Sequence, residues 1–193
     1  MKKHLQQCLF VLLYCSCTTV SISAQEGYGP ASTKDVQAEE VLKQLISATG
    51  DKNLTEGKYQ VRLVTNPPHK TVWSECPKVD GKLLGTIFIG SEFRERLTKE
   101  QLMAVLSHEL GHWVNQVVHD PPGSFKWLDH EIAANRYAIK TLVLNGFGPE
   151  TARQLVGEIL EKSFAFNPCK TVACKRNKQL LFDAVSIPPI SPR

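Results

Sequence analysis

Apolar residues recur every three or four positions in five stretches of the chain, which is the spacing of a helix buried on one face. Gly50 stops the first of these stretches, and Asn145-Gly146 closes the third. Thr98 and Gln101 form a capping box at the start of the second. The pattern therefore predicts helices over residues 33–49, 98–118, 125–144, 149–163 and 171–185.

Alternating apolar and polar positions predict a β-strand over residues 59–65. Branched and aromatic residues predict a second strand over residues 82–89. The stretch between them, residues 69–80, has no clear period and predicts an irregular connection. Strands followed by a run of helices indicate an α+β domain that is mainly helical and carries a small sheet. We assign this domain to residues 33–186, after a flexible lead-in at 25–32 and before a Pro-rich tail at 187–193.

Residues 1–24 have the layout of a secretory signal peptide: two lysines, an apolar core over 8–17, and small polar residues ending at Ala24. The core is about half as long as the roughly 20 residues that a spanning helix needs, which argues against a membrane anchor. The residues before Cys15 and Cys17 fit a lipidation site poorly. We therefore expect an exported protein, periplasmic or secreted, without a stable membrane span after cleavage.

Cleavage after Ala24 would leave about 169 residues, enough for one domain with a sizeable core. It would also remove two lysines and lower the formal net charge from +4 to about +2. The basic pI therefore predicts no nucleic-acid partner. Of the three cysteines that remain, Cys169 and Cys174 are close enough to pair in an exported protein, which would leave Cys76 over. The sequence leaves this pairing open.

The candidate chemistry lies in His108-Glu109-Leu110-Gly111-His112, an H-E-x-x-H pattern inside a predicted helix. Residues four apart leave the same helical face one turn apart, so His108 and His112 can ligate one zinc ion. Glu109 then stands beside the metal and can take a proton from a zinc-activated water as general base.

Two histidines do not complete a catalytic zinc site, which usually has three protein ligands and one open position. The metzincin extension of the motif fails, because Asn115 and Val118 stand where it needs Gly and His. His119 lies about 10 Å from His112 along a straight helix, too far to reach the same ion.

Glu131, on the next predicted helix, is the candidate third ligand. Ala133, Ala134 and Ala138 beside it would allow the two helices to approach closely enough for a short carboxylate to reach the metal. Asp129 and His130 are its competitors. Asn135, one turn after Glu131, could accept a hydrogen bond from a ligand imidazole and so select its tautomer.

Three segments together resemble the gluzincin peptidases of the HtpX and CAAX-prenyl-protease type: LLGTIFIGS, LTKEQLMAVLSHELGHWVNQ and HEIAANRYA. The resemblance covers about residues 82–147. It implies a zincin-like α+β fold with the sheet beside the H-E-x-x-H helix. It also implies a zinc-dependent endopeptidase in which His108, His112 and Glu131 bind the metal and Glu109 is the catalytic base. A strand before the active-site helix, here Thr86 to Ile89, would hold the substrate in extended form.

The chain departs from this family pattern in three ways. Asn135 stands where the family usually has Asp. The family's membrane-spanning helices are missing, which indicates a minimal, soluble, exported form. No histidine follows His130 to stabilise the oxyanion, so Tyr137, Arg136 and Arg153 are the candidates for that role.

We therefore predict an endopeptidase that binds one Zn²⁺ per chain and cleaves extended or unfolded polypeptide. Two alternatives remain open. The first is a catalytically weak or inactive binding module that zinc stabilises, which the Asn135 departure motivates. The second is another zinc hydrolase with Cys76 as the third ligand. The sequence leaves the cleavage preference, the oligomeric state and any autoinhibition open.

Overall fold

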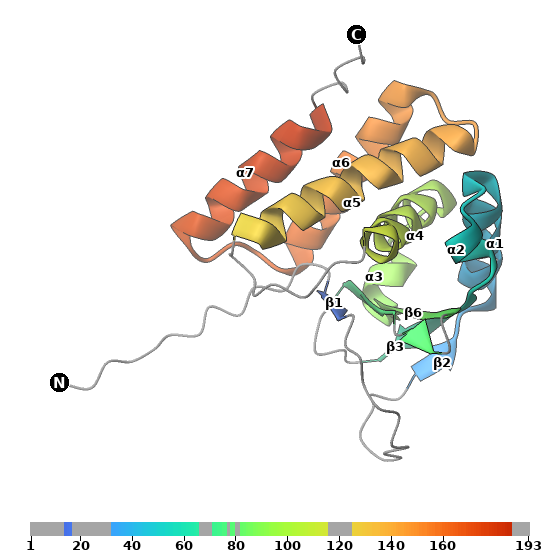
Figure 1. The fold of residues 1–193 in the computed structure, drawn as a ribbon. Helices are drawn as coiled ribbons and strands as arrows, with labels where there is room; N and C mark the ends of the chain where they lie inside the picture. Colours follow the sequence, from blue (N-terminus) through green and yellow to red (C-terminus); the bar gives the residue numbers. More distant parts are fainter. Residues whose placement is uncertain are drawn as a thin grey trace, which may run out of the picture.

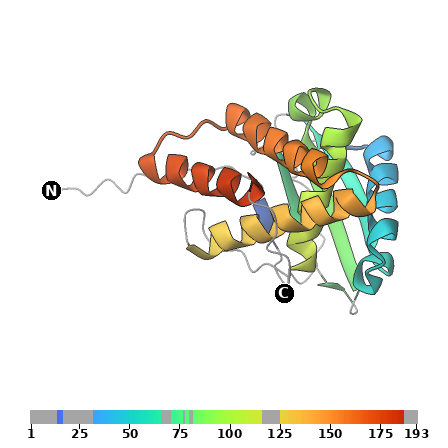
Figure 2. The ribbon, with the colours of Figure 1, turned by 90° about the horizontal axis from the view of Figure 1, so that it is seen from above.

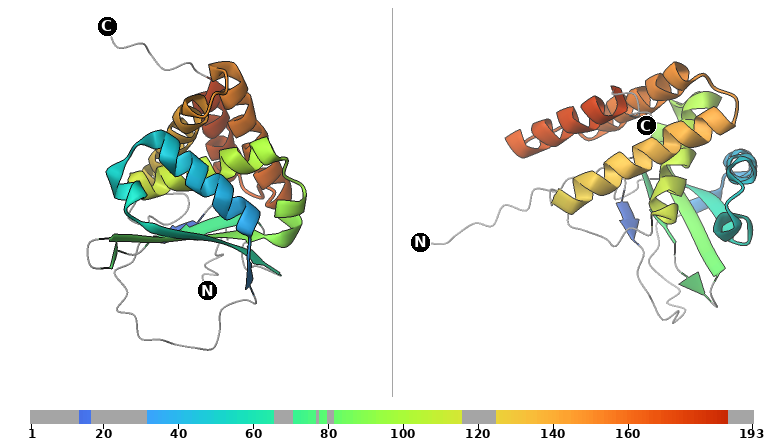
Figure 3. Two further views of the ribbon diagram at one scale, coloured as in Figure 1. Left: turned by 90° about the vertical axis from the view of Figure 1, so that its right-hand side faces the viewer. Right: turned by 45° about the horizontal axis from the view of Figure 1, so that its top comes forward.

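The structure is a computed structural model, and it describes residues 14–16, 32–65, 71–76, 78–79, 82–115 and 125–186. The predicted tail at 187–193, His119 and most of the predicted signal peptide and lead-in lie outside these residues. The described residues form a sheet with helices covering one of its faces (Figures 1 and 3).

The sheet has six strands in the order β1-β4-β6-β3-β2, with β5 paired to β6 off this path. The central strand β6 pairs in parallel with β3 on one side and antiparallel with β4 on the other. At one end β1 pairs in parallel with β4, and at the other β2 pairs antiparallel with β3. The strand bounds are β1 Tyr14–Ser16, β2 Ser32–Lys34, β3 Lys58–Val64, β4 Val72–Glu75, β5 Lys78–Val79 and β6 Lys82–Gly90.

Seven helices are present in the described residues: α1 Val36–Thr49, α2 Lys52–Thr55, α3 Ser91–Glu95, α4 Lys99–Val114, α5 Phe125–Leu144, α6 Pro149–Phe166 and α7 Val172–Ser186. The central one is α4, which packs against the sheet and against α1, α5 and α6. Because its neighbours surround it, every residue from Gln101 to Trp113 is buried. The candidate motif therefore lies inside the protein.

The inner face of the sheet is apolar, as expected for strands that pack on buried helices. Alternate residues of β6 are buried on this face: Leu83, Gly85, Ile87 and Ile89. Gly85 is required here, because a Cβ at this position would lie 2.5 Å from the Trp113 ring. The Trp113 ring also stacks on Tyr59 of β3, with 5.2 Å between the ring centroids. This packing fixes the end of α4 against the sheet.

The predicted helices are confirmed, with shifted ends. The first begins at Val36 rather than Thr33, because Asp35 caps it by accepting a hydrogen bond from the Ala38 amide and residues 32–34 pair with β3. The predicted capping box at Thr98 is present. The helix it starts runs to Val114, with Asn115 as its C-cap, and the predicted residues 116–118 lie outside the described residues. The helix α6 continues to Phe166 rather than Ser163.

The interpretation of residues 69–80 as irregular is wrong, because they contain β4 and β5. Both strands are short and become strands by pairing with β6, which a local pattern does not reveal. The placement of a substrate along Thr86–Ile89 is also wrong. Both edges of that segment are occupied, one by β3 and the other by β4.

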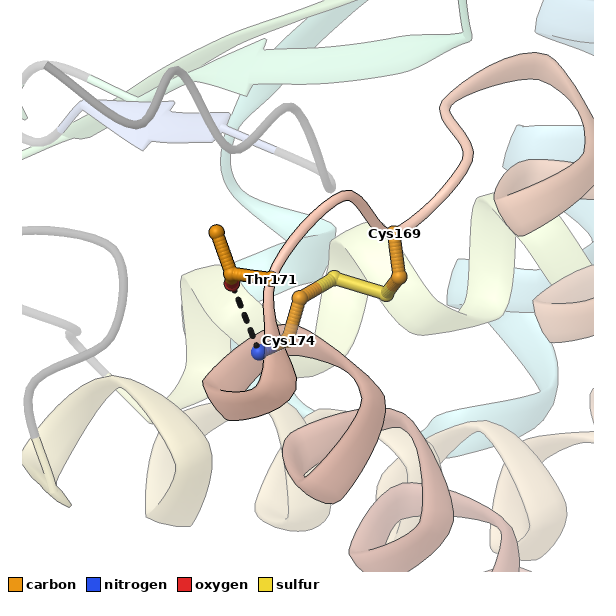
Figure 4. Close-up of a disulfide and its surroundings, with 3 residues drawn as sticks. All are labelled: Cys169, Thr171 and Cys174. Carbon is orange, nitrogen blue, oxygen red and sulfur yellow. Dashed lines mark hydrogen bonds between the residues drawn. A yellow bond between two sulfur atoms is a disulfide. The ribbon is translucent and has the colours of Figure 1, made fainter. Parts of the chain in front are cut away.

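Cys169 and Cys174 form a disulfide, with 5.4 Å between their Cα atoms (Figure 4). It links the connection that follows α6 to the first turn of α7, where the Thr171 hydroxyl also accepts a hydrogen bond from the Cys174 amide. The structure thus settles the pairing that the sequence left open. Cys76 takes no part in it and lies in the hydrophobic core.

None of the helices in the described residues is long and apolar enough to cross a membrane.

Candidate metal centre

The helix α4 carries His108, Glu109 and His112 on its buried surface, as the motif predicted. The three side chains are 3 %, 0 % and 2 % exposed. The two imidazole rings lie one turn apart, with 4.6 Å between their centroids. A buried ionisable side chain is costly unless it has a partner or a metal, so three adjacent ones point to a shared role.

The helix α5 approaches α4 at Gly111, the second variable position of the motif. A Cβ on Gly111 would lie 2.8 Å from the Cα of Ala134 and 2.9 Å from its carbonyl oxygen. Real Cβ atoms do not come so close to backbone, so only glycine permits this separation of the two helices. The prediction that small residues allow a close approach is confirmed at this pair.

This approach brings Glu131 to the two histidines. Its Oε2 lies 3.3 Å from His108 Nε2, and its Oε1 lies 3.5 Å from His112 Nε2. The two Nε2 atoms are 2.9 Å apart. Within the described residues, these three side chains are the only group of His, Cys, Asp or Glu with metal-ligand spacing.

The spacing fits zinc. Two ligand atoms at about 2.1 Å from a tetrahedral ion stand about 3.4 Å from each other. The three observed separations, 2.9, 3.3 and 3.5 Å, lie around that value. Two imidazole nitrogens and one carboxylate oxygen are also a known ligand set for catalytic zinc.

Asn135 takes the supporting position predicted for it. Its Oδ1 lies 2.8 Å from His108 Nδ1, and both side chains are buried. The amide oxygen can only accept, so His108 donates from Nδ1, and the neutral imidazole keeps its lone pair on Nε2, the atom that lies beside the other two ligand atoms and is left to bind a metal. The amide nitrogen of Asn135 is buried without a hydrogen-bond partner among the described residues. An aspartate at this position would not leave such a donor.

Protons compete with a metal in this cluster. Burial lowers the pKa of His108, but Glu131, through its hydrogen bond and charge, together with the Glu109 charge and the Asn135 hydrogen bond, raises it overall. Burial raises the pKa of Glu131, which His108 opposes. Without metal both groups therefore hold protons more tightly than usual. Zinc must displace these protons, so its binding should strengthen as the pH rises.

Glu109 has the electrostatics of a general base. Burial raises its pKa to about 7, against the opposing effects of His108 and the hydroxyl of Ser74. A base is most effective when its pKa lies near the working pH. The Ser74 hydroxyl donates a hydrogen bond of 2.5 Å to Glu109 Oε2. We did not predict Ser74 from the sequence, although it follows Val72 at strand spacing.

The other candidate residues do not join the cluster. Cys76 is buried in the core and is not part of the metal-spaced group, which argues against it as third ligand. Burial raises the pKa of Tyr137, which the neighbouring Thr49 and Thr141 oppose. Arg153 pairs with Glu150, and Arg136 is exposed. The structure does not distinguish among Tyr137, Arg136 and Arg153 as the residue that stabilises the oxyanion, and that role stays a prediction.

Residues 34–119 match the family model described as Peptidase family M48. The match covers a little under half of the chain. It supports the resemblance to HtpX-type gluzincins and, at the level of the family, a zinc metallopeptidase. No curated protein and no solved structure matches the chain. The matched segment contains the H-E-x-x-H residues and ends before Glu131, so the case for Glu131 rests on the geometry of α5.

Proposed function

We propose that this chain is an exported endopeptidase of the M48 type that holds one zinc ion on His108, His112 and Glu131 and cleaves extended or unfolded polypeptide. The observation that carries the proposal is the buried cluster itself. Three ligand atoms stand at zinc spacing, and a carboxylate with a raised pKa follows the first of them. The disulfide supports export, because such bonds form and persist in oxidising compartments.

Each residue of the site has a separate role, which follows from its position. Bound zinc would polarise the scissile carbonyl and lower the pKa of the attacking water toward neutrality. Glu109 accepts the proton of that water and passes it to the leaving amine. Asn135 keeps His108 in the tautomer that leaves Nε2 open. The packed helices exclude bulk water, which strengthens each of these interactions.

The substrate would lie along β4, the strand whose Ser74 hydroxyl donates a hydrogen bond to Glu109. One edge of β4 is paired with β6, and the opposite edge is paired with Tyr14–Ser16 of β1. Those three residues belong to the predicted signal peptide. Cleavage after Ala24 would remove them and open this edge to an extended peptide.

The test compares wild-type residues 25–193 with Glu109→Gln, measuring zinc content and casein cleavage. We expect the variant to keep its zinc and to cleave about 10²- to 10⁴-fold more slowly, since general-base catalysis contributes about that much. Glu39→Gln is the matched control, because Glu39 is a buried glutamate of α1 outside the cluster. Equal rates for Glu109→Gln and wild type would contradict the assigned base. A zinc-loaded wild type without cleavage would favour the binding-module alternative.

A further inference from the structure

Ser74 is a polar side chain among apolar neighbours on the inner face of the sheet. It lies on β4 opposite Ile87 of β6, and it is 0 % exposed. Val72, two residues earlier on the same face, is apolar and buried, as is Ile87. A hydroxyl in such surroundings is unfavourable unless it forms a hydrogen bond. The location of Ser74 therefore calls for an explanation.

The explanation is Glu109. The Ser74 hydroxyl donates to Glu109 Oε2 at 2.5 Å, between residues 35 positions apart in the chain. A hydrogen bond to a carboxylate is short and about twice as strong as one between neutral groups. Both side chains are fully buried, so water does not compete with this contact.

The two oxygens of Glu109 differ as a result. Oε2 is held by Ser74, whereas Oε1 is buried and has no hydrogen-bond partner among the described residues. Fixing one oxygen also fixes the rotation of the carboxylate plane. Oε1 is then the oxygen left to receive a proton.

We propose that Ser74 is a positioning residue, which holds the Glu109 carboxylate so that Oε1 faces the reacting water. This inference rests on the proposed peptidase function. It also links substrate to base, because the main chain of Ser74 belongs to the strand along which the substrate would pair. One strand would thus set the distance between the scissile bond and the proton acceptor. A misplacement of about 1 Å can reduce a rate by about 10²-fold.

The experiment measures kcat and KM for casein-derived peptide with Ser74→Ala, Ser74→Thr and wild-type residues 25–193. Ser74→Ala should lower kcat by about 10- to 100-fold with KM and zinc content unchanged, and Ser74→Thr should recover most of kcat through its hydroxyl. Ser163→Ala is the control, because Ser163 is a buried serine of α6 outside the site. In a Glu109→Gln background, Ser74→Ala should have no further effect on kcat.

A second readout needs neither zinc nor activity. In metal-free protein, the urea unfolding of Ser74→Ala, Glu109→Ala and the double variant should be non-additive, because each single change breaks the same bond. Additive changes would overturn the contact. An unchanged kcat in Ser74→Ala, or a changed KM alone, would overturn the positioning role while leaving the proposed function intact. A wild type that cleaves nothing would overturn the proposed function itself.

Discussion

The helix pairs α4–α5 and α6–α7 pack by opposite means. Between α4 and α5 the backbones nearly touch at Gly111, and the contact encloses the polar side chains of the cluster. Between α6 and α7 the contact is made by apolar side chains, Phe164 and Phe182 among them, and by the disulfide at their junction. The two pairs lie side by side, since α7 also packs on α5 (Figure 2).

The difference shows which region carries function. Buried carboxylates and imidazoles do not stabilise a fold by themselves, because removing them from water is unfavourable. The α4–α5 contact is therefore explained by a ligand that uses those groups. The α6–α7 contact needs no such explanation, because apolar burial and a covalent link suffice.

The largest expected effect comes from a glycine-to-alanine substitution in the α4–α5 pair, compared with the same substitution in the α6–α7 pair. Gly111→Ala would drive a Cβ into the Ala134 backbone, so the helices must separate; we expect a loss of about 1–3 kcal/mol in the free energy of unfolding, and weaker zinc binding. Gly157→Ala on α6 meets nothing within 4 Å and should stabilise by about 0.5–1 kcal/mol. Urea unfolding and zinc titration of both variants measure this. Equal effects would mean that the close approach is not needed.

Asn135 tests whether the polar contact serves the metal. Asn135→Ala removes the acceptor of His108 Nδ1 and should weaken zinc binding by about 10- to 100-fold. Asn135→Asp should strengthen it, because a charged acceptor makes the imidazole a better ligand and removes the unpartnered amide nitrogen. Competition with a zinc chelator gives both affinities. An unchanged affinity in Asn135→Ala would assign this side chain to packing alone.

The disulfide should have the smallest effect on the metal. Replacing Cys169 and Cys174 by serine should cost about 2 kcal/mol of stability, as expected for a short loop. Zinc affinity should stay within about twofold of wild type, because the bond joins Cys169, which follows α6, to α7, and neither of these helices carries a residue of the metal cluster. Thermal unfolding and zinc titration separate the two quantities. Loss of zinc in this variant would show that the two pairs are coupled.

The parts of the site that depend on local spacing could be predicted from the sequence. His108, Glu109 and His112 share one helix, so their relation follows from the period of the helix alone. The role of Glu131 could be predicted from the sequence, because the alanines around it indicate a close contact between two helices. Asn135 followed from Glu131, one turn away. All these inferences use positions on two helices that the hydrophobic pattern identified.

The features that could not be predicted from the sequence depend on pairing between strands that are distant in the chain. The strand character of β4 arises from its register with β6, so the polar Ser74 could not be placed beside Glu109 from the local sequence. The same pairing explains the misplaced substrate strand. A strand rich in branched residues indicates burial, but it does not reveal which of its edges is occupied.

The central claim is that α4 and α5 together form a zinc site whose third ligand is Glu131. Metal analysis of purified residues 25–193 tests it most directly, beside Glu131→Ala and Cys76→Ala. We expect about one zinc per chain in wild type and in Cys76→Ala, and none in Glu131→Ala. Zinc retained by Glu131→Ala and lost from Cys76→Ala would contradict the account.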